Sequence, residues 1–172
     1  MMKKTVIHTA LSHEAKPIIQ HFNLTCKDTK PYNIYENEDM VLVVSGIGAK
    51  NTKEALSFVV NLYKAEVFIN FGVAGCKDEN IKKGTLFCTT HKDLDLPFAT
   101  ITQNEIAFTC KEDLNTLLVD MESSTFLESI PKEATKYIFK VVSDYCEDKI
   151  PSKNELNHWI KDSLKKWEKY AR

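Results

Sequence analysis

The segment Tyr137-Ile138-Phe139-Lys140-Val141-Val142-Ser143-Asp144 is a β-rich, mostly apolar run that ends in a carboxylate. A second apolar run, Leu117-Leu118-Val119, continues as Asp120-Met121-Glu122. Short runs of this kind are typical of buried strands. Ligands and catalytic groups collect at the carboxyl edge of the sheet in open α/β folds. We therefore expect Glu122 and Asp144 to belong to one active site.

Strand-like and helix-like segments alternate from one end of the chain to the other. This order predicts an α/β fold with three layers, in which a mixed central sheet is flanked by helices. Ser12 is the expected N-cap of the first helix. Residues 98–110 are expected to form a β-hairpin or two irregular strands. The other expected strands are 5–11, 32–35, 40–44, 67–71, 84–90 and 137–142, and the expected helices are 13–22, 51–63, 122–130 and a C-terminal helix from about 152.

Length and composition set the broad class of protein. The 172 residues suit a single domain, 1–172, with a real core, and no repeat or linker interrupts it. With 43% hydrophobic and 27% charged residues, the chain is typical of a soluble globular protein. A net charge of −1 argues against nucleic-acid or membrane partners.

Cysteine and targeting patterns indicate a cytoplasmic location. The five cysteines are scattered singly, with no C-x-x-C pair, which favours reduced thiols over disulfides or a zinc site. The apolar piece after Lys3-Lys4 is short and lacks a small-residue cleavage site, so we do not expect a signal peptide. No apolar stretch reaches the length of a membrane span.

Two glycine-containing segments each follow an expected strand. Ser45-Gly46-Ile47-Gly48 lies between a strand and a helix, where backbone amides can face an anion or a sugar, but the same segment also fits a tight turn. It matches neither the dinucleotide fingerprint nor the P-loop. Asn70-Phe71-Gly72-Val73-Ala74-Gly75 allows close approach of a ligand to the backbone, or only a sharp turn.

A third acid, Glu14, follows the first expected strand at a position like those of Glu122 and Asp144. One acid at a helix start is common, because it interacts favourably with the helix dipole. Three acids at matching positions favour a common site, since a sheet gathers its carboxyl ends at one edge. The five histidines show no metal-ligand spacing and are expected at the surface or in the core. No metal or other cofactor is expected.

Taken together, these segments resemble the purine nucleoside phosphorylase and nucleosidase superfamily, and most closely the 5′-methylthioadenosine/S-adenosylhomocysteine nucleosidases. The resemblance covers most of the chain in the same order. The matching segments are Ala10-Leu11-Ser12-His13-Glu14, Val44-Ser45-Gly46-Ile47-Gly48-Ala49-Lys50, Ile69-Asn70-Phe71-Gly72-Val73-Ala74-Gly75, Asp93-Leu94-Asp95, Asp120-Met121-Glu122 and Val142-Ser143-Asp144.

The resemblance implies a nucleoside phosphorylase-like fold and hydrolysis of the N-glycosidic bond of a purine nucleoside. Asp144 would then protonate the leaving base and Glu14 would activate water. Glu122 would bind the ribose hydroxyls and Met121 would lie under the sugar. The remaining residues implied to bind substrate are Ser143, Gly46, Val73, Ala74, Gly75 and Phe108.

The middle of the chain departs from the family pattern. The family is normally several dozen residues longer, and the missing material falls between about Asp95 and Asp120. Residues 102–108 match the usual T/S-G-D-x-F segment, which stacks on the base, only weakly. A binding protein that kept the fold and lost activity is therefore one alternative. Relatives commonly form dimers or larger homo-oligomers, and apolar residues within 101–108 could serve such contacts.

A phosphate-dependent phosphorylase is the other alternative. Related phosphorylases hold phosphate with arginines, which make bidentate contacts. The single arginine of this chain is its last residue, Arg172. Lysines could bind phosphate as point charges, but the lack of an internal arginine and the presence of Glu14 favour water as the nucleophile. The expected partner is a small-molecule nucleoside.

Overall fold

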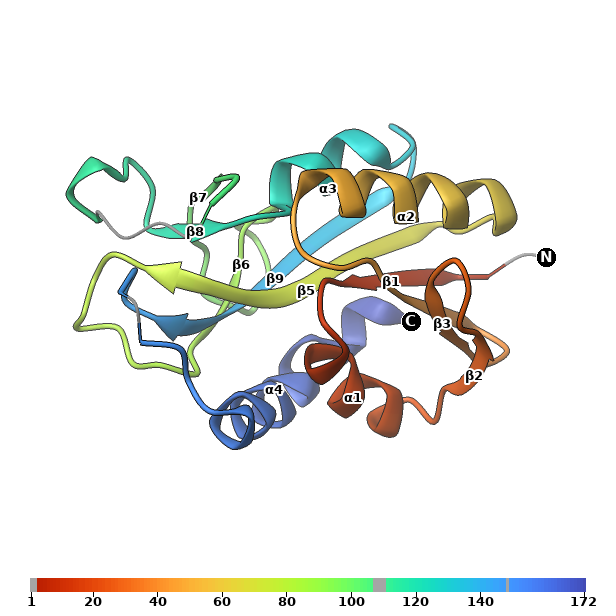
Figure 1. The fold of residues 1–172 in the computed structure, drawn as a ribbon, viewed down its shortest axis with the longest axis horizontal. Helices are drawn as coiled ribbons and strands as arrows, with labels where there is room; N and C mark the ends of the chain where they lie inside the picture. The colour runs from red at the N-terminus through yellow and green to blue at the C-terminus, as the bar shows by residue number, and fades with distance from the viewer. Residues whose placement is uncertain (1–2, 107–110, 148) are drawn as a thin grey trace.

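The computed structural model describes residues 3–106, 111–147 and 149–172 (Figure 1). Within these residues nine strands form one sheet. Its centre consists of four parallel strands: β4 (Met40–Val44), β1 (Thr5–Thr9), β5 (Val67–Cys76) and β9 (Thr135–Asp144). No helix in this part of the chain has the length and apolar character needed to cross a membrane.

Antiparallel strands complete the sheet on both sides. β3 (Asn33–Glu36) pairs with β4, and β2 (Thr25–Asp28) pairs with β3. On the other side, β6 (Leu86–Cys88) runs antiparallel to β9. β8 (Leu118–Asp120) runs antiparallel to the end of β5, and β7 (Ile101–Gln103) lies parallel to β8. The sheet is therefore mixed, as predicted.

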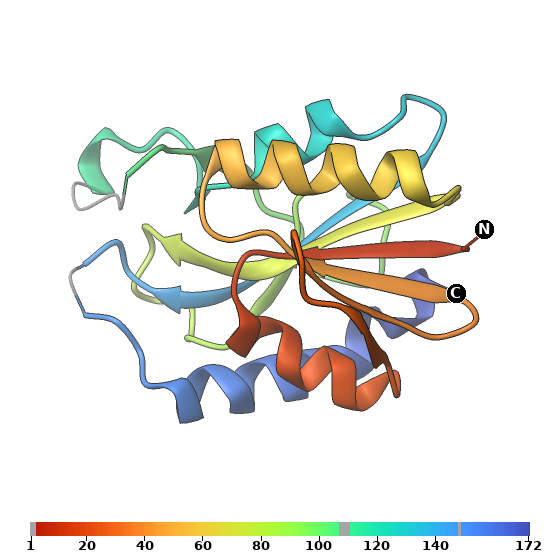
Figure 2. The ribbon, with the colours of Figure 1, turned by 45° about the vertical axis from the view of Figure 1, so that its right-hand side comes forward.

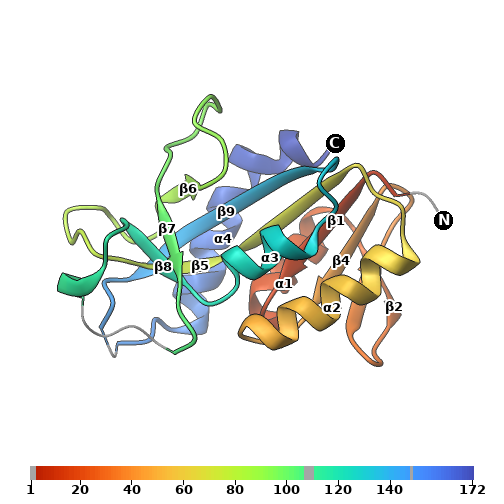
Figure 3. The ribbon, with the colours of Figure 1, turned by 90° about the horizontal axis from the view of Figure 1, so that it is seen from above.

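Helices cover both faces of the sheet. α2 (Ala49–Leu62) and α3 (Ser123–Ser129) lie on one face, and α1 (Ser12–His21) and α4 (Lys153–Trp167) lie on the other (Figure 2). The view in Figure 3 shows α2 and α3 side by side over the central strands. Two short 3-10 helices, η1 (Lys111–Asp113) and η2 (Glu168–Ala171), complete the described elements. The three-layer α/β prediction is confirmed.

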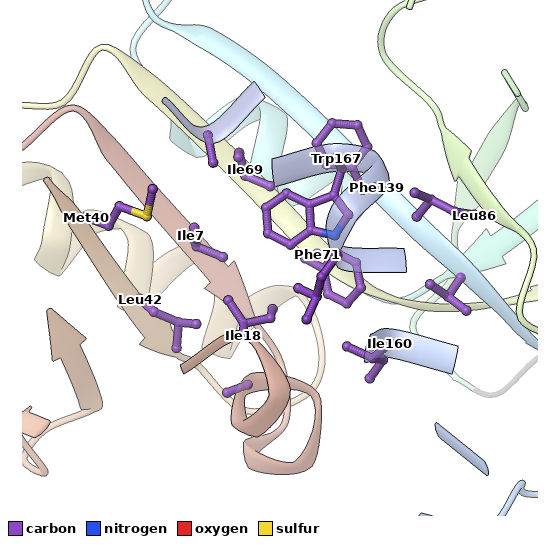
Figure 4. Packing of buried hydrophobic residues seen from close by; sticks show 14 of the residues in the cluster. Ile7, Ile18, Met40, Leu42, Ile69, Phe71, Leu86, Phe139, Ile160 and Trp167 are labelled. Carbon is purple, nitrogen blue, oxygen red and sulfur yellow. The ribbon is translucent and has the colours of Figure 1, made fainter. Parts of the chain in front are cut away.

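The larger hydrophobic core lies between the sheet and the α1/α4 layer (Figure 4). The fully buried Trp167 stacks on Phe71 of β5 and Phe139 of β9, with ring centroids 5.2 and 5.7 Å apart. Aromatic pairs at such distances contribute beyond the area they bury. The C-terminal helix is thereby fixed against the two long central strands.

A second core lies between the sheet and the α2/α3 layer. Alternate residues of the central strands, such as Val6, Phe68 and Ile138, face Leu56 of α2 and Phe126 of α3. This follows from the two-residue period of a strand, which sends successive side chains to opposite faces. The apolar runs of the central strands are therefore buried on both sides.

Several sequence-based expectations about the elements need correction. Residues 72–75 were expected to follow a strand as a loop, but they lie inside β5, which is ten residues long. The exposed strand β2 was not predicted, because its sequence TCKD has no apolar pattern. Leu11, not Ser12, is the N-cap residue of α1. Of the two alternatives expected at 98–110, a β-hairpin or two irregular strands, the hairpin is wrong over the described part, where the short strand β7 pairs with the later strand β8 in parallel.

Candidate active site

The site begins at a gap beside the long strand β5. β1 pairs with β5 over residues 67–70, and β8 pairs along the same strand only at residues 75–76. Between these pairings, no described strand pairs with residues 71–74 on that side. β5 and β9 extend well past the end of β1 (Figure 1). Backbone groups and side chains that would be covered inside a continuous sheet are therefore accessible here.

Glu14 enters this gap from the first turn of α1 and is almost completely buried. Its Oε1 accepts a hydrogen bond from the backbone N–H of Val73 at 3.3 Å, and its Oε2 accepts one from Leu11 N–H at 3.0 Å. Burial raises the pKa of Glu14 to about 7, against the opposing effect of the nearby Lys140 charge and these two backbone donors. The carboxyl group therefore changes protonation state near neutral pH.

Gly72 leaves the space that Glu14 needs. A Cβ at this position would lie 3.2 Å from Glu14 Oε1 and 3.4 Å from the ammonium nitrogen of Lys140. The first distance is tighter than ordinary van der Waals contact, and the second is at its lower limit. The absence of a side chain at this point of β5 lets the carboxylate and the ammonium lie directly against the strand.

Glu122 reaches the same gap from the turn between β8 and α3 and is also buried. Its Oε1 accepts a hydrogen bond from the backbone N–H of Gly48 at 2.9 Å. Among the described residues, its Oε2 has no hydrogen-bond partner. Because β8 runs antiparallel to β5, Glu122 does not come from a shared carboxyl edge, as the sequence argument assumed. It meets Glu14 because β8 runs back toward the end of β1.

Asp144 is the last residue of β9 and lies opposite Gly75 of β5. Its Oδ2 accepts a hydrogen bond from Ser143 Oγ at 2.6 Å, and its Oδ1 accepts one from Cys146 N–H at 2.9 Å. A Cβ on Gly75 would lie only 3.0 Å from Oδ1. Two donors and the neighbouring strand therefore fix the orientation of this carboxylate.

All three acids line one cavity of about 460 Å³. Its size falls within the range of small-molecule sites. Much of the lining is apolar, and the mouth carries the exposed side chains of Ile47, Ile106 and Ile150. The other lining residues are Ala10, Leu11, His13, Val73, Ala74, Gly75, Val119, Asp120, Met121, Ser143, Glu147, Lys149, Pro151, Lys153 and Leu156. No group of His, Cys, Asp and Glu among the described residues could hold a metal ion.

An ion pair beside the acids was not predicted from the sequence. Lys140 Nζ lies 2.8 Å from Asp120 Oδ2, and both side chains are 1% exposed. Burial alone would lower the pKa of Lys140, but the charges of Asp120, Glu122 and Glu14 outweigh it and raise the pKa. Lys140 therefore stays charged. In the sequence, this ion pair is indicated by a lysine in the middle of an apolar strand, because a buried charge requires a partner.

The structure places most of the predicted site residues together. Glu14, Glu122, Asp144, Met121, Ser143, Val73, Ala74 and Gly75 all line the cavity. Gly46 is not among the described lining residues; its neighbour Ile47 lines the cavity, and Gly48 binds Glu122. Phe108 lies outside the residues that the structure describes. The chemical roles assigned to these residues remain predictions.

Fold and site together define an α/β fold with a mostly apolar cavity that holds three acids, beside the extended ends of two central strands. The sequence model of the Phosphorylase superfamily matches residues 4–99, more than half of the chain. The chain therefore belongs to this superfamily.

Two curated relatives extend the comparison. An aminodeoxyfutalosine nucleosidase of Campylobacter jejuni is 29% identical over 137 residues, which are 70% of this chain and 58% of the relative. A 5′-methylthioadenosine/S-adenosylhomocysteine nucleosidase of Buchnera aphidicola is 30% identical over 131 residues, 72% of this chain and 53% of the relative. The chain thus spans just over half the length of these two relatives.

A solved structure supports the fold. The crystal structure of 5′-methylthioadenosine/S-adenosylhomocysteine nucleosidase from Helicobacter pylori with butyl-thio-DADMe-Immucillin-A superimposes with a TM-score of 0.81. The match covers 98% of this chain and 97% of that chain at 16% identity. At this identity the likeness establishes the architecture alone.

Proposed function

We propose that the cavity hydrolyses the N-glycosidic bond of a purine nucleoside of the methylthioadenosine or adenosylhomocysteine type and releases the base. The observation that carries the proposal is the convergence of Glu14, Glu122 and Asp144 on one cavity. Cleavage of this bond requires a proton for the leaving base, stabilisation of positive charge on the sugar, and a nucleophile at the anomeric carbon. Three acids in different surroundings can divide these tasks.

Glu14 is the proposed base for the attacking water. A base works best when its pKa lies near the working pH, and burial raises the pKa of Glu14 to about 7. The backbone donors of Leu11 and Val73 fix both oxygens in place. Because the ionised form must accept the proton of water, the contribution of Glu14 to the rate should rise as the pH passes about 7.

Glu122 is the proposed ligand of the ribose hydroxyls. Its Oε1 is held by Gly48 N–H, which leaves Oε2 to accept from the sugar. A fixed negative charge at this place also favours the oxocarbenium-like transition state. Met121, on the same turn, lines the cavity and offers a polarisable apolar surface under the sugar.

Asp144 is the proposed acid for the leaving base, at purine N7. Its hydrogen bonds to Ser143 and Cys146 set the direction in which the carboxyl group faces the cavity. Gly75 and Ala74 of β5 lie beside it on the cavity wall. General acid catalysis of this kind typically contributes about 10²–10⁴ in rate.

The two curated relatives support the reaction type, since both are named as nucleosidases. The whole reaction and its substrate remain part of the proposal, because the chain spans only just over half of their length. A phosphorylase is the second candidate. Lys149 and Lys153 line the cavity and could attract a phosphate, whereas Arg172 is exposed at the end of the chain.

Turnover assays with and without phosphate separate these candidates. Purified protein is incubated with methylthioadenosine, adenosylhomocysteine, inosine and adenosine, and the released base is measured by chromatography. The proposal predicts release without phosphate and no acceleration when phosphate is added. Release that depends on phosphate would establish the phosphorylase. Binding of nucleosides without release from any of them would establish a binding protein.

We further propose that the chain folds as a single domain, 1–172, acts in the cytoplasm and forms a homo-oligomer. All four cysteines that the structure describes are free thiols, which suits a reducing compartment. At the cavity mouth Ile106 is 72% exposed and Ile150 is 89% exposed, so a second copy could cover apolar surface there. Light scattering on the purified protein tests the oligomeric state, and cell fractionation tests the location.

A further inference from the structure

A buried polar network lies on the α2/α3 side of the sheet, close to the proposed ribose ligand. Its centre is His8, in the middle of β1, where it pairs with Val43 of β4 and Asn70 of β5. His8 is fully buried, and its ring stacks with Phe126 of α3 at a centroid distance of 6.2 Å. Buried polar side chains of this kind are costly unless they are hydrogen-bonded.

The hydrogen bonds of His8 have a defined direction. Asn70 Nδ2 donates to His8 Nδ1 at 2.8 Å, so the proton of the neutral ring is on Nε2. Nε2–H then donates to Ser45 Oγ at 2.7 Å, and Ser45 Oγ donates to the carbonyl of Gly46 at 2.6 Å. Burial, together with the charge of Lys140, lowers the pKa of His8 to about 3 despite the opposing effect of Asp120. The ring is therefore neutral at neutral pH, and the network has one protonation state.

The network fixes the segment 45–48, which binds Glu122. The backbone N–H groups of Ser45 and Gly46 donate to the carbonyls of Thr9 and Ala10, which anchors the start of the segment to β1. At its far end, Gly48 N–H donates to Glu122 Oε1 at 2.9 Å. The side-chain bond from His8 to Ser45 adds a further anchor at the start of the same segment. Displacement of Ser45 would therefore displace the donor that orients Glu122.

We propose that His8 is a positioning residue, which orients Glu122 toward the ribose hydroxyls through Ser45 and the 45–48 segment. This inference rests on the proposed function of the cavity. His8 does not itself line the cavity. Its effect is transmitted by hydrogen bonds, as is common for residues that support a functional site from behind.

The test measures discrimination between ribose and deoxyribose. Values of kcat/KM are compared for adenosine and for its 2′-deoxy and 3′-deoxy analogues, in the wild type, His8→Phe, Ser45→Ala and the double variant. Phenylalanine keeps the ring beside Phe126 but makes no hydrogen bond to Ser45. Because a hydrogen bond to a charged group is at stake, we expect the preference for ribose to fall about tenfold or more.

Three controls separate positioning from a general loss of stability. Val6→Ala, on the same strand and face as His8, should lower the melting temperature but keep the ribose preference. His8→Gln retains an N–H donor for Ser45 and should restore part of the preference. The effects of His8→Phe and Ser45→Ala should be non-additive, because both remove the same link.

Three results would overturn the inference: a wild-type ribose preference in His8→Phe, an equal loss in Val6→Ala, or additive effects of His8→Phe and Ser45→Ala. If the wild type releases no base, the proposed function fails, and the same preference is measured as nucleoside affinity by calorimetry. A ribose preference in affinity that His8→Phe removes would still support the positioning role. An affinity preference that His8→Phe leaves unchanged, or no nucleoside binding at all, would contradict it.

Discussion

Asp144 is held by groups that an asparagine can also satisfy. In the Asp144→Asn variant the new amide oxygen would accept from Cys146 N–H, and the amide nitrogen would donate to Ser143 Oγ. Ser143 Oγ could then donate to the carbonyl of Ala74, which lies 3.3 Å away. The substitution therefore removes the transferable proton and leaves the local packing intact.

We expect Asp144→Asn to lower kcat by about 10²–10⁴ with an unchanged melting temperature, since general acid catalysis contributes on that scale. The released base is the readout. Asp39→Asn, at an exposed acid outside the cavity lining, is the matched control and should keep full activity. Equal turnover in Asp144→Asn and the wild type would remove Asp144 from the mechanism.

Glu14 makes the stability of the protein depend on pH. Its pKa is raised from 4.5 to about 7 in the folded state. The folded protein therefore binds more protons than the unfolded chain between these values. The favourable contribution of the protonated carboxyl is complete below the unfolded pKa and is lost as the pH rises through about 7.

We expect Glu14→Gln to become more stable relative to the wild type as the pH rises, because glutamine does not ionise. The difference in unfolding free energy should shift in favour of the variant by about 2 kcal/mol between about pH 5 and about pH 8. Glutamine has one acceptor oxygen instead of two, so the backbone N–H of Val73 or of Leu11 loses its partner, which adds a cost that does not depend on pH. Urea unfolding at both pH values measures the shift, and a constant difference would show that Glu14 ionises normally.

At the scale of single residues, the sequence indicated the acids better than their surroundings. Glu14, Glu122 and Asp144 were found because each follows an apolar run or an expected strand. Lys140 carries a weaker signal: a lysine inside an apolar run needs a buried partner, but the run does not show that the partner is Asp120. His8 was expected either at the surface or in the core, since one histidine in a strand carries no signal about which groups it will bind.

At the scale of elements, a buried ion pair joins β9 to β8, the strand before α3. Lys140 Nζ lies 2.8 Å from Asp120 Oδ2, and Asp120 also accepts hydrogen bonds from the backbone N–H and the hydroxyl of Ser123, in the first turn of α3. Removal of one partner from a buried pair leaves an uncompensated charge. The junction of β8 and α3, which places Glu122, therefore depends on Lys140.

We expect Lys140→Met to cost about 3–5 kcal/mol of unfolding free energy, because Asp120 is left buried without its ion partner. The double variant Lys140→Met/Asp120→Asn should recover a substantial part of that loss, since it buries no unpaired charge. Chemical denaturation of both variants provides the comparison. A single variant as stable as the wild type, or a double variant less stable than the single one, would argue against a compensating pair.

Sequence patterns predicted the central elements well and the edges poorly. β4 begins and ends at the predicted residues, because a continuous apolar run marks a strand buried on both faces. The extension of β5 through Gly72 and Gly75 was not predicted, since glycine is usually a turn signal. Its strand conformation there depends on pairing with β9, which is distant in the chain. A local pattern does not contain that contact.

At the scale of the whole molecule, the sheet has a gap between the ends of β1 and β8, and the three acids line the cavity at this gap from three different elements. Glu14 comes from α1, Glu122 from the turn after β8, and Asp144 from the end of β9. The sequence predicts one shared region on the assumption that the strands before the acids are parallel and end at the same edge, but β8 runs antiparallel to β5. The acids therefore converge for a different geometric reason from the one inferred. The three-layer fold and the family were correctly inferred from the order of the motifs.

The central claim is that these three carboxylates surround one bound nucleoside. A crystal structure of the Asp144→Asn variant soaked with methylthioadenosine tests it most directly. The account predicts the ribose hydroxyls at Glu122, a water between Glu14 and the anomeric carbon, and purine N7 within hydrogen-bond reach of residue 144, at about 2.6–3.2 Å. A nucleoside bound outside the cavity, or bound with its sugar away from Glu14 and Glu122, would contradict it.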